Sequence, residues 1–274
     1  MEIQHRRVDK ARGIIQITAT DERWYTREVE GQLQIRPSVT WITGHYPKGK
    51  GFEIWLRRTG NAADEIRDAA GDEGSTIHAA CGDLLAGKIV KHDAVYFNET
   101  SGRPEQITPY EMDGVLSFID WYENDRRCGL GKGCTVGQHC LQIIAHDLVL
   151  WPDDYDAAGT LDIKAVRSCD GSFGIIDLKR SKAIYAGHRA QVQAYRKFDV
   201  DTRRSNGWAA ILQLSYPYNK KQKYKLTIVP NKDWSLFLTA RRIWREQSAN
   251  VKPHQKDYPL AMMLTDRQQP DIAT

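Results

Sequence analysis

"GTLDIKAVRSCDGSFGIIDLK" (residues 159–179) places charged side chains inside two apolar runs. Residues two apart on a strand project from the same face, so Asp177 and Lys179 are expected to lie side by side. The turn "SCDGS" can return the second strand antiparallel to the first, which would bring Asp162 close to Asp177. Covered charges persist when they pair with one another or with a metal, so we expect a charged cluster here.

The segments before this stretch predict strands and then helices. The sequence "EVEGQLQI" within residues 13–39 indicates short strands joined by a hairpin turn at its glycine. Asn61 is expected to cap one helix, and Ser75 or Thr76 a second helix that ends near Gly87.

A third helix and a loop are expected next. Thr108-Pro109-Tyr110-Glu111 combines a capping box with proline in the first turn. The glycine-rich "RRCGLGKGCTVGQ" predicts a loop, and it is not a phosphate-binding P-loop because Lys132 is followed by Gly133 instead of Ser or Thr. The apolar face expected for the helix comprises Met112, Val115, Leu116, Ile119 and Tyr122.

Beyond the loop the pattern becomes strand-rich. We expect strands in "CLQIIAHDLVLW", "AAGTLDIKAV" and "FGIIDLK", a helix from about 186 to 198, and strands in "WAAILQLSY" and "YKLTIVP". Asn231 is expected to cap a last helix that buries Leu236, Phe237, Ala240, Ile243 and Trp244. This order predicts an α/β fold with a mixed central β-sheet flanked by helices. We expect one domain over 1–274, with strands and helices in 1–130, a core in 140–250 and a loosely held tail in 252–274.

Composition narrows the class of protein. Hydrophobic residues make up 41% of 274 residues, and no apolar run approaches the roughly 20 residues of a membrane span. The basic N-terminal segment lacks the apolar stretch of a secretory signal, so a cytoplasmic location is expected. The five cysteines form an odd, sparse set and are expected to be reduced thiols.

Two carboxylates beside one lysine form a hard-oxygen site of the kind that Mg²⁺ or Mn²⁺ prefers. Such a metal can polarise a phosphodiester and lower the pKa of a bound water, while a lysine stabilises the developing charge. The residues therefore favour phosphodiester hydrolysis. An ordinary surface ion pair is the alternative explanation for Asp177 and Lys179 taken alone.

"GTLD", "IIDLK" and "QVQAY" follow one another in an order that resembles the RecB-type branch of the PD-(D/E)XK nuclease superfamily. "GSTIH" (residues 74–78) is similar to the histidine-bearing helix of that branch. Residues 37–55 resemble the opening of phage-encoded nucleases of this branch and of the mitochondrial genome maintenance exonucleases, and this resemblance implies a bacterial host or phage-infected cell. The resemblance implies a restriction-endonuclease-like core with an N-terminal helical elaboration. It also implies metal ligation by His78, Asp162, Asp177 and the carbonyl of Leu178, with Asp162, Asp177, Lys179, Gln191 and Tyr195 as catalytic residues.

Several residues have simpler explanations when the resemblance is set aside. His78 is then a boundary histidine, and Gln191 and Tyr195 form an ordinary amphipathic helix boundary. Many relatives carry a glutamate in the strand before G-x-x-D, whereas here the nearest acid is Asp147, beside His146.

The cysteines bear on two further kinds of metal centre, an iron–sulfur cluster and a zinc site. No cysteine follows Cys169, so the late cysteines of iron–sulfur relatives are missing and no such cluster is expected. Cys128, Cys134, His139 and Cys140 have the ligand types of a zinc site but lack its usual close pair, and ordinary loop thiols suffice.

The expected function is a Mg²⁺- or Mn²⁺-dependent deoxyribonuclease acting on single-stranded or end-containing DNA in recombination, repair or replication, with a partner protein from those processes. Basic clusters interleaved with aromatics suit contact with single strands. The alternatives are a non-catalytic DNA-binding or scaffolding protein and a restriction-type endonuclease. The residues expected to contact nucleic acid are Arg180, Ser181, Lys48, Lys50, Tyr216 and Lys220.

Overall fold

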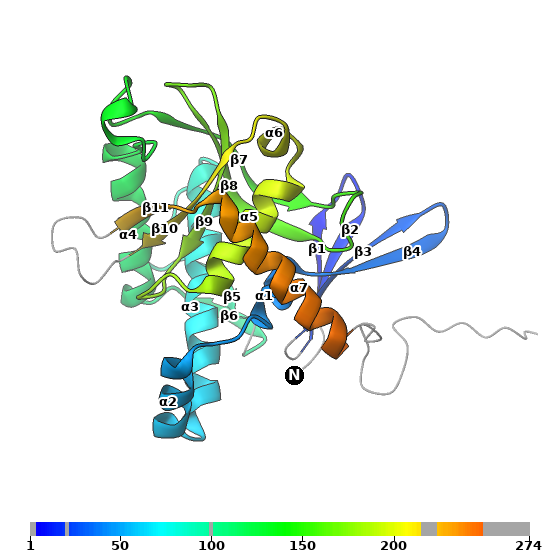
Figure 1. Cartoon of the computed structure of the whole chain (residues 1–274). Helices are drawn as coiled ribbons and strands as arrows, with labels where there is room; N and C mark the ends of the chain where they lie inside the picture. Colours follow the sequence, from blue (N-terminus) through cyan, green and yellow to red (C-terminus); the bar gives the residue numbers. More distant parts are fainter. Residues whose placement is uncertain (1–3, 20–21, 99–100, 215–223, 249–274) are drawn as a thin grey trace, which may run out of the picture.

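Residues 159–179 lie in a mixed β-sheet. The computed structural model describes residues 4–19, 22–98, 101–214 and 224–248, and in them this sheet has five strands in the order β11-β10-β9-β8-β7 (Figure 1). The α/β fold with a mixed sheet is thus confirmed. The strands are β7 (Leu141–Leu150), β8 (Gly159–Arg167), β9 (Phe173–Lys179), β10 (Trp208–Leu214) and β11 (Tyr224–Ile228).

Strand direction follows from the connections. β7, β8 and β9 are antiparallel neighbours joined along the chain, and β10 and β11 are also antiparallel. β9 and β10 are parallel, which requires a crossover, and the helix α5 (Ala186–Phe198) supplies it. A short helix, α6 (Val200–Arg204), follows α5. The crossover brings the start of α5 close to the end of β9, where Lys179 lies.

Helices cover both faces of this sheet (Figure 1). On one face, Leu161, Ile175 and Ile211 pack against α5, α1 (Val39–Gly44) and α7 (Trp234–Ser248). On the other face, Ile163, Ile176 and Leu212 pack against α3 (Ala62–Leu85) and α4 (Pro109–Asn124). The hydrophobic core therefore has two layers separated by the sheet.

The first strands form a separate sheet of order β1-β2-β3-β4. Its last two strands turn at Glu30 and Gly31, both with positive φ, which confirms the expected hairpin. Ser38 bridges this sheet to the central one, because its N–H donates to Arg23 O and it pairs with Ala158. The strands are β1 (Gln4–Asp9), β2 (Ile14–Ala19), β3 (Glu22–Val29) and β4 (Gln32–Pro37), and a small hairpin later pairs β5 (Val95–Asn98) with β6 (Arg103–Gln106).

α3 differs from the sequence prediction. The expected pair of helices is wrong, because α3 runs unbroken from Ala62 to Leu85. Ser75 lies inside the helix, and its hydroxyl donates to Gly71 O one turn earlier. Ile77 is buried against α4 and the sheet, and such packing holds a helix through residues of low propensity such as Gly74.

Other helix boundaries also differ from the sequence prediction. α2 (Lys50–Thr59) and α1 were not predicted. Asn61 stands at the start of α3, but its side chain makes no capping hydrogen bond there. A short 3-10 turn at Asn231–Asp233 precedes α7, so Asn231 is not the cap of that helix.

α4 begins as predicted but buries a shifted face. The capping box is present, with the Glu111 N–H donating to Thr108 Oγ1 and the Thr108 N–H donating to Glu111. Leu116, expected in the core, is 52% exposed, whereas Phe118 and Trp121 are buried under the sheet. The two large aromatic rings decide the helix rotation because they bury the most apolar surface.

The segment between α4 and β7 is a loop with a short 3-10 turn at Gly131–Gly133, as expected. α7 buries Phe237, Ala240 and Trp244, which confirms part of the predicted stripe. The tail at 252–274 lies outside the described residues. Among the helices that the structure describes, none has the length and apolarity needed to cross a membrane.

The continuity of α3 can be tested with a pair of glycine substitutions. Gly74→Ala adds a methyl group in open space and should raise the free energy of unfolding by about 0.5–1 kcal/mol. Gly114→Ala in α4 should lower it by about 1–3 kcal/mol, because its Cβ would lie 2.7 Å from Ile77 Cδ1. Urea unfolding measures both, and destabilisation by Gly74→Ala would indicate a helix break at that position.

Candidate functional site

β8 and β9 separate where their acids lie. Main-chain pairing runs along the hairpin as far as Ile163 and Ile176. Beyond this pair, the Leu178 N–H donates to Asp162 Oδ2 at 2.7 Å. A side-chain carboxylate thus takes the place of a strand carbonyl, and buried N–H groups need such a partner. The expected approach of Asp162 to the second strand is confirmed.

His78 joins α3 to both strands. Its Nδ1 lies 3.2 Å from Asp162 Oδ1, and its Nε2 lies 3.0 Å from Leu178 O. Both partners are acceptors, so the two bonds together require a proton on each ring nitrogen. Burial lowers the pKa of His78, but the Asp162 carboxylate raises it by more, and the net pKa is above its ordinary value. The imidazolium form is therefore favoured.

The Asp162 carboxylate responds in the opposite direction. Burial raises its pKa, but His78, Lys179 and the Leu178 N–H together lower it, so the net pKa is below the ordinary value. Asp162 therefore ionises at a lower pH than Asp177.

Asp177 is almost fully buried, with 1% of its surface exposed. Lys179 Nζ lies 2.7 Å from its Oδ2, which confirms that the two side chains share a face. Among the described residues, Asp177 Oδ1 is buried and accepts no hydrogen bond. Burial outweighs the attraction of Lys179 and raises the pKa of Asp177 to about 6. Such an oxygen is available to a cation.

α5 places Gln191 and Tyr195 against the start of β8. Gln191 Nε2 donates to the Tyr195 hydroxyl at 3.2 Å, and burial raises the pKa of Tyr195 well above its usual range. A Cβ at Gly159 would lie 2.6 Å from Tyr195 Cε1, so only glycine admits the ring there. Burial, and then the Lys179 cation, lower the pKa of His188 to about 3. Gln191 and Tyr195 thus pack against the start of the strand that carries Asp162.

Asp147 extends the row of acids onto β7. His146 pairs with Ile163 and Leu148 with Leu161, so Asp147 stands opposite Asp162 in the register. Its backbone has a positive φ of 48°, and its Oδ2 lies where a Cβ on Gly82 of α3 would be. A third carboxylate therefore lies on the adjoining strand.

The residues expected to contact nucleic acid are dispersed. Arg180 follows Lys179 and lies over the ring of Tyr110 at 4.0 Å, while Ser181 donates to Ala183 O. Lys48 lies over Phe52, and Lys50 begins α2, which projects away from the sheet in Figure 1. Tyr216 and Lys220 lie outside the described residues. One residue that the sequence analysis did not select is Tyr185, which is 59% exposed just before α5.

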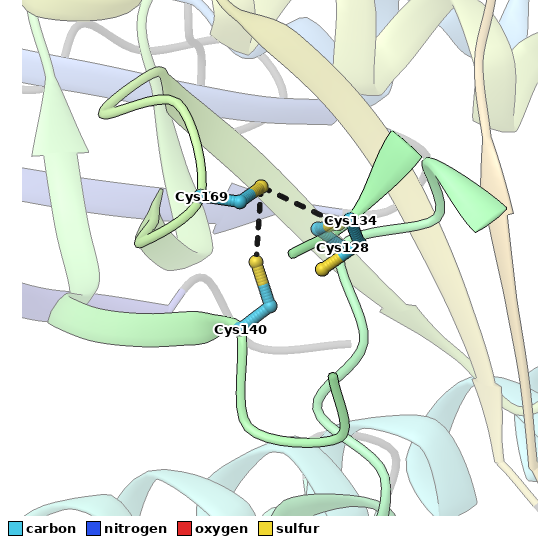
Figure 2. Close-up of side chains that lie close together, drawn as sticks. All are labelled: Cys128, Cys134, Cys140 and Cys169. Atoms are coloured by element: carbon cyan, nitrogen blue, oxygen red, sulfur yellow. Dashed lines mark hydrogen bonds between the residues drawn. The ribbon is translucent and has the colours of Figure 1, made fainter. Parts of the chain in front are cut away.

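The cysteines are arranged differently from the sequence expectation. Cys128, Cys134 and Cys140 meet Cys169 from the β8–β9 turn (Figure 2). His139 is exposed and lies outside the group. The candidate ligand set therefore needs correction, because Cys169 takes the place of His139. Cys140 and Cys169 are 29 residues apart in the chain, so local spacing could not reveal the group.

The sequence was also compared with known proteins. It matches no protein-family model and no curated protein. The geometry of the chain therefore carries the functional argument.

The burial of Asp177 predicts a pH-dependent cost. Its folded-state pKa of about 6 lies above the ordinary 3.8, so the fold favours the protonated carboxyl. This stabilisation is complete below pH about 4 and is lost as the pH rises through 6. In the presence of EDTA, Asp177→Asn should therefore raise the free energy of unfolding at pH 7.5 by up to about 3 kcal/mol, and by little at pH 4.

Asp9→Asn is the matched control of opposite sign. Hydrogen bonds from the backbone and side chain of Arg12 lower the pKa of Asp9, so its stabilisation is present at neutral pH and lost in acid. This variant should be less stable than the parent at pH 7.5. Urea unfolding at both pH values tests the pair, and equal destabilisation by the two variants at pH 7.5 would contradict the assigned burial of Asp177.

Proposed function

We propose that this chain is a Mg²⁺- or Mn²⁺-dependent deoxyribonuclease with a PD-(D/E)XK core, acting on single-stranded or end-containing DNA. The observation that carries the proposal is the convergence of two carboxylates, a lysine and a histidine where β8 and β9 separate. The order β11-β10-β9-β8-β7 with a crossover helix supports the same proposal. The preference for DNA rests on the motif resemblance.

The residues fit a hard divalent cation. Asp177 Oδ1 is buried without a hydrogen-bond partner among the described residues, and the carboxylate of Asp162 lies on the neighbouring strand. The cation would be held by Asp162, Asp177, the Leu178 carbonyl and His78. When bound, it would supply positive charge to a phosphodiester and lower the pKa of a water molecule.

His78 takes part through its proton. As an imidazolium it neutralises Asp162 and donates a hydrogen bond to the Leu178 carbonyl. Its positive charge balances the charge of the acids. A ligating imidazole must be neutral, so loading the site should release a proton from His78. In the metal-free site, His78 thus supplies the positive charge that a bound cation would supply instead.

Lys179 supplies a second positive charge beside the acids. Asp177 holds its ammonium group at 2.7 Å, and the lysine side chain is partly exposed, unlike the acid beneath it. A compact ammonium placed in this way can stabilise negative charge that develops on a phosphate oxygen. Lys179 is the catalytic lysine of the proposal.

Gln191 and Tyr195 act as positioning residues in this scheme. The Tyr195 hydroxyl accepts from Gln191, and the ring packs on Gly159 close to the acids. The exposed ring of Tyr185, in the segment that follows Lys179, suits stacking against an unpaired base. The substrate would then approach from the end of β9.

Replacement of Lys179 tests the proposal directly. Lys179→Ala should reduce cleavage of labelled single-stranded and linear duplex DNA by at least about 100-fold with Mg²⁺ or Mn²⁺, because the charge on the phosphate is no longer stabilised. Lys232→Ala, an exposed lysine in the turn before α7, is the control and should cleave like the parent. EDTA should abolish cleavage by the parent.

The substrates separate the alternatives. Loss of linear but not circular DNA indicates an end-dependent exonuclease, whereas discrete fragments from a circular plasmid indicate a restriction-type enzyme. Full activity of Lys179→Ala would contradict the proposed role of the lysine. Retained DNA binding without cleavage under any metal, and without heat on titration with Mn²⁺, would replace the proposal with a scaffolding protein.

A further inference from the structure

Four cysteine thiols gather at the far end of the β8–β9 hairpin. Cys128 and Cys134 lie in the loop after α4, Cys140 lies just before β7, and Cys169 lies in the turn between β8 and β9 (Figure 2). This turn is about 20 Å along β8 from Asp162, at about 3.3 Å per residue. The group is therefore separate from the acids.

The spacing of the sulfur atoms matches a single tetrahedral ion. All four Sγ atoms lie within 4.8 Å of one another. The Cys140 thiol is 3.2 Å from Cys169 Sγ, which in turn is 3.8 Å from Cys128 Sγ. A tetrahedron with zinc–sulfur bonds of about 2.3 Å has sulfur–sulfur edges of about 3.8 Å. A polynuclear iron–sulfur core would need its cysteines further apart.

The surroundings favour a metal-binding group over chance proximity. Cys128 and Cys140 are fully buried, and all four thiols are free of disulfide bonds. Their loop is anchored at both ends, since the Leu141 N–H donates to Arg126 O and the Ser168 N–H donates to Cys140 O. Four soft sulfur ligands without a carboxylate select zinc over Mg²⁺ or Mn²⁺.

Cys134 belongs to the group although it lies in the outer, half-buried part of the loop. Its Sγ lies within 4.8 Å of the other three sulfur atoms, and its thiol donates to Gly137 O at 4.0 Å. The loop therefore holds this thiol close to the other three.

The loop gives a physical reason for such a site. Gly129, Gly131 and Gly137 all have positive φ, a conformation that glycine adopts at a high cost in chain entropy. The residues from Gly129 to His139 are exposed or only half-buried, so they gain little from the hydrophobic core. A metal that ties the loop to the β8–β9 turn would offset this entropy.

We propose that Cys128, Cys134, Cys140 and Cys169 bind one Zn²⁺ ion as a closed, structural site. Four protein ligands leave no position for water or substrate, so the ion does not take part in hydrolysis. Its role is to fix the loop after α4 against the end of the hairpin that carries Asp162 and Asp177. The site is independent of the proposed nuclease activity.

Metal analysis of the purified chain tests the site. The parent should contain one zinc ion per chain, and Cys169→Ser should lose it. Cys81→Ala is the matched control, because Cys81 is the fifth cysteine, is buried under the sheet and lies outside the group. It should retain the zinc, as should Asp177→Asn, which places the ion away from the acids.

Measurements on the parent keep the test independent of variant folding. Exchange with Co²⁺ should give the intense visible absorption of tetrahedral cobalt thiolate, and a mercurial reagent should release one zinc as four thiols react. A reduced chain that contains no zinc and takes up neither Zn²⁺ nor Co²⁺ would overturn the proposal. A Cys140–Cys169 disulfide in the thiol-blocked protein, or iron with inorganic sulfide, would overturn it equally.

Discussion

The hydrogen bond from the Leu178 N–H to the Asp162 carboxylate is the interaction on which the rest of the site depends. It replaces a main-chain bond between β8 and β9, so the two strands separate there without leaving a buried N–H unpaired. The Leu178 carbonyl then faces α3, where His78 binds it together with Asp162. One carboxylate thus links two strands and a helix that are far apart in the chain.

The fold sustains a site that costs it stability. Asp177 is buried, and one of its oxygens accepts no hydrogen bond among the described residues. Such a group is tolerated because apolar layers on both faces of the sheet hold the strands in place. Lys179 lies 2.7 Å from one oxygen, and the other is the oxygen that the proposed cation would contact. This imbalance distinguishes Asp177 from the acid of an ordinary ion pair such as Lys164 with Asp199, in which both carboxylate oxygens have partners.

The β8–β9 hairpin has different chemistry at its two ends. Oxygen ligands and a lysine lie where the strands separate, and four sulfur atoms lie at the turn. Hard and soft donors select different ions, so the proposed Mg²⁺ or Mn²⁺ site and the proposed zinc site would not compete for the same metal. The turn end is held by a glycine-rich loop whose residues from Gly129 to His139 are exposed or half-buried, whereas the acid end is held by helices on both faces.

The sequence by itself determined the features that depend on local periodicity and capping. It predicted the strands of the central sheet, the capping box at Thr108 and Glu111, and the shared face of Asp177 and Lys179. Tertiary packing decided the features that depend on contacts between residues distant in the chain. It kept α3 continuous, brought His78 to Asp162 across 84 residues, and replaced His139 by Cys169 in the cysteine group. No local pattern encodes these contacts, because their free energy arises from burial and pairing that exist only in the folded chain.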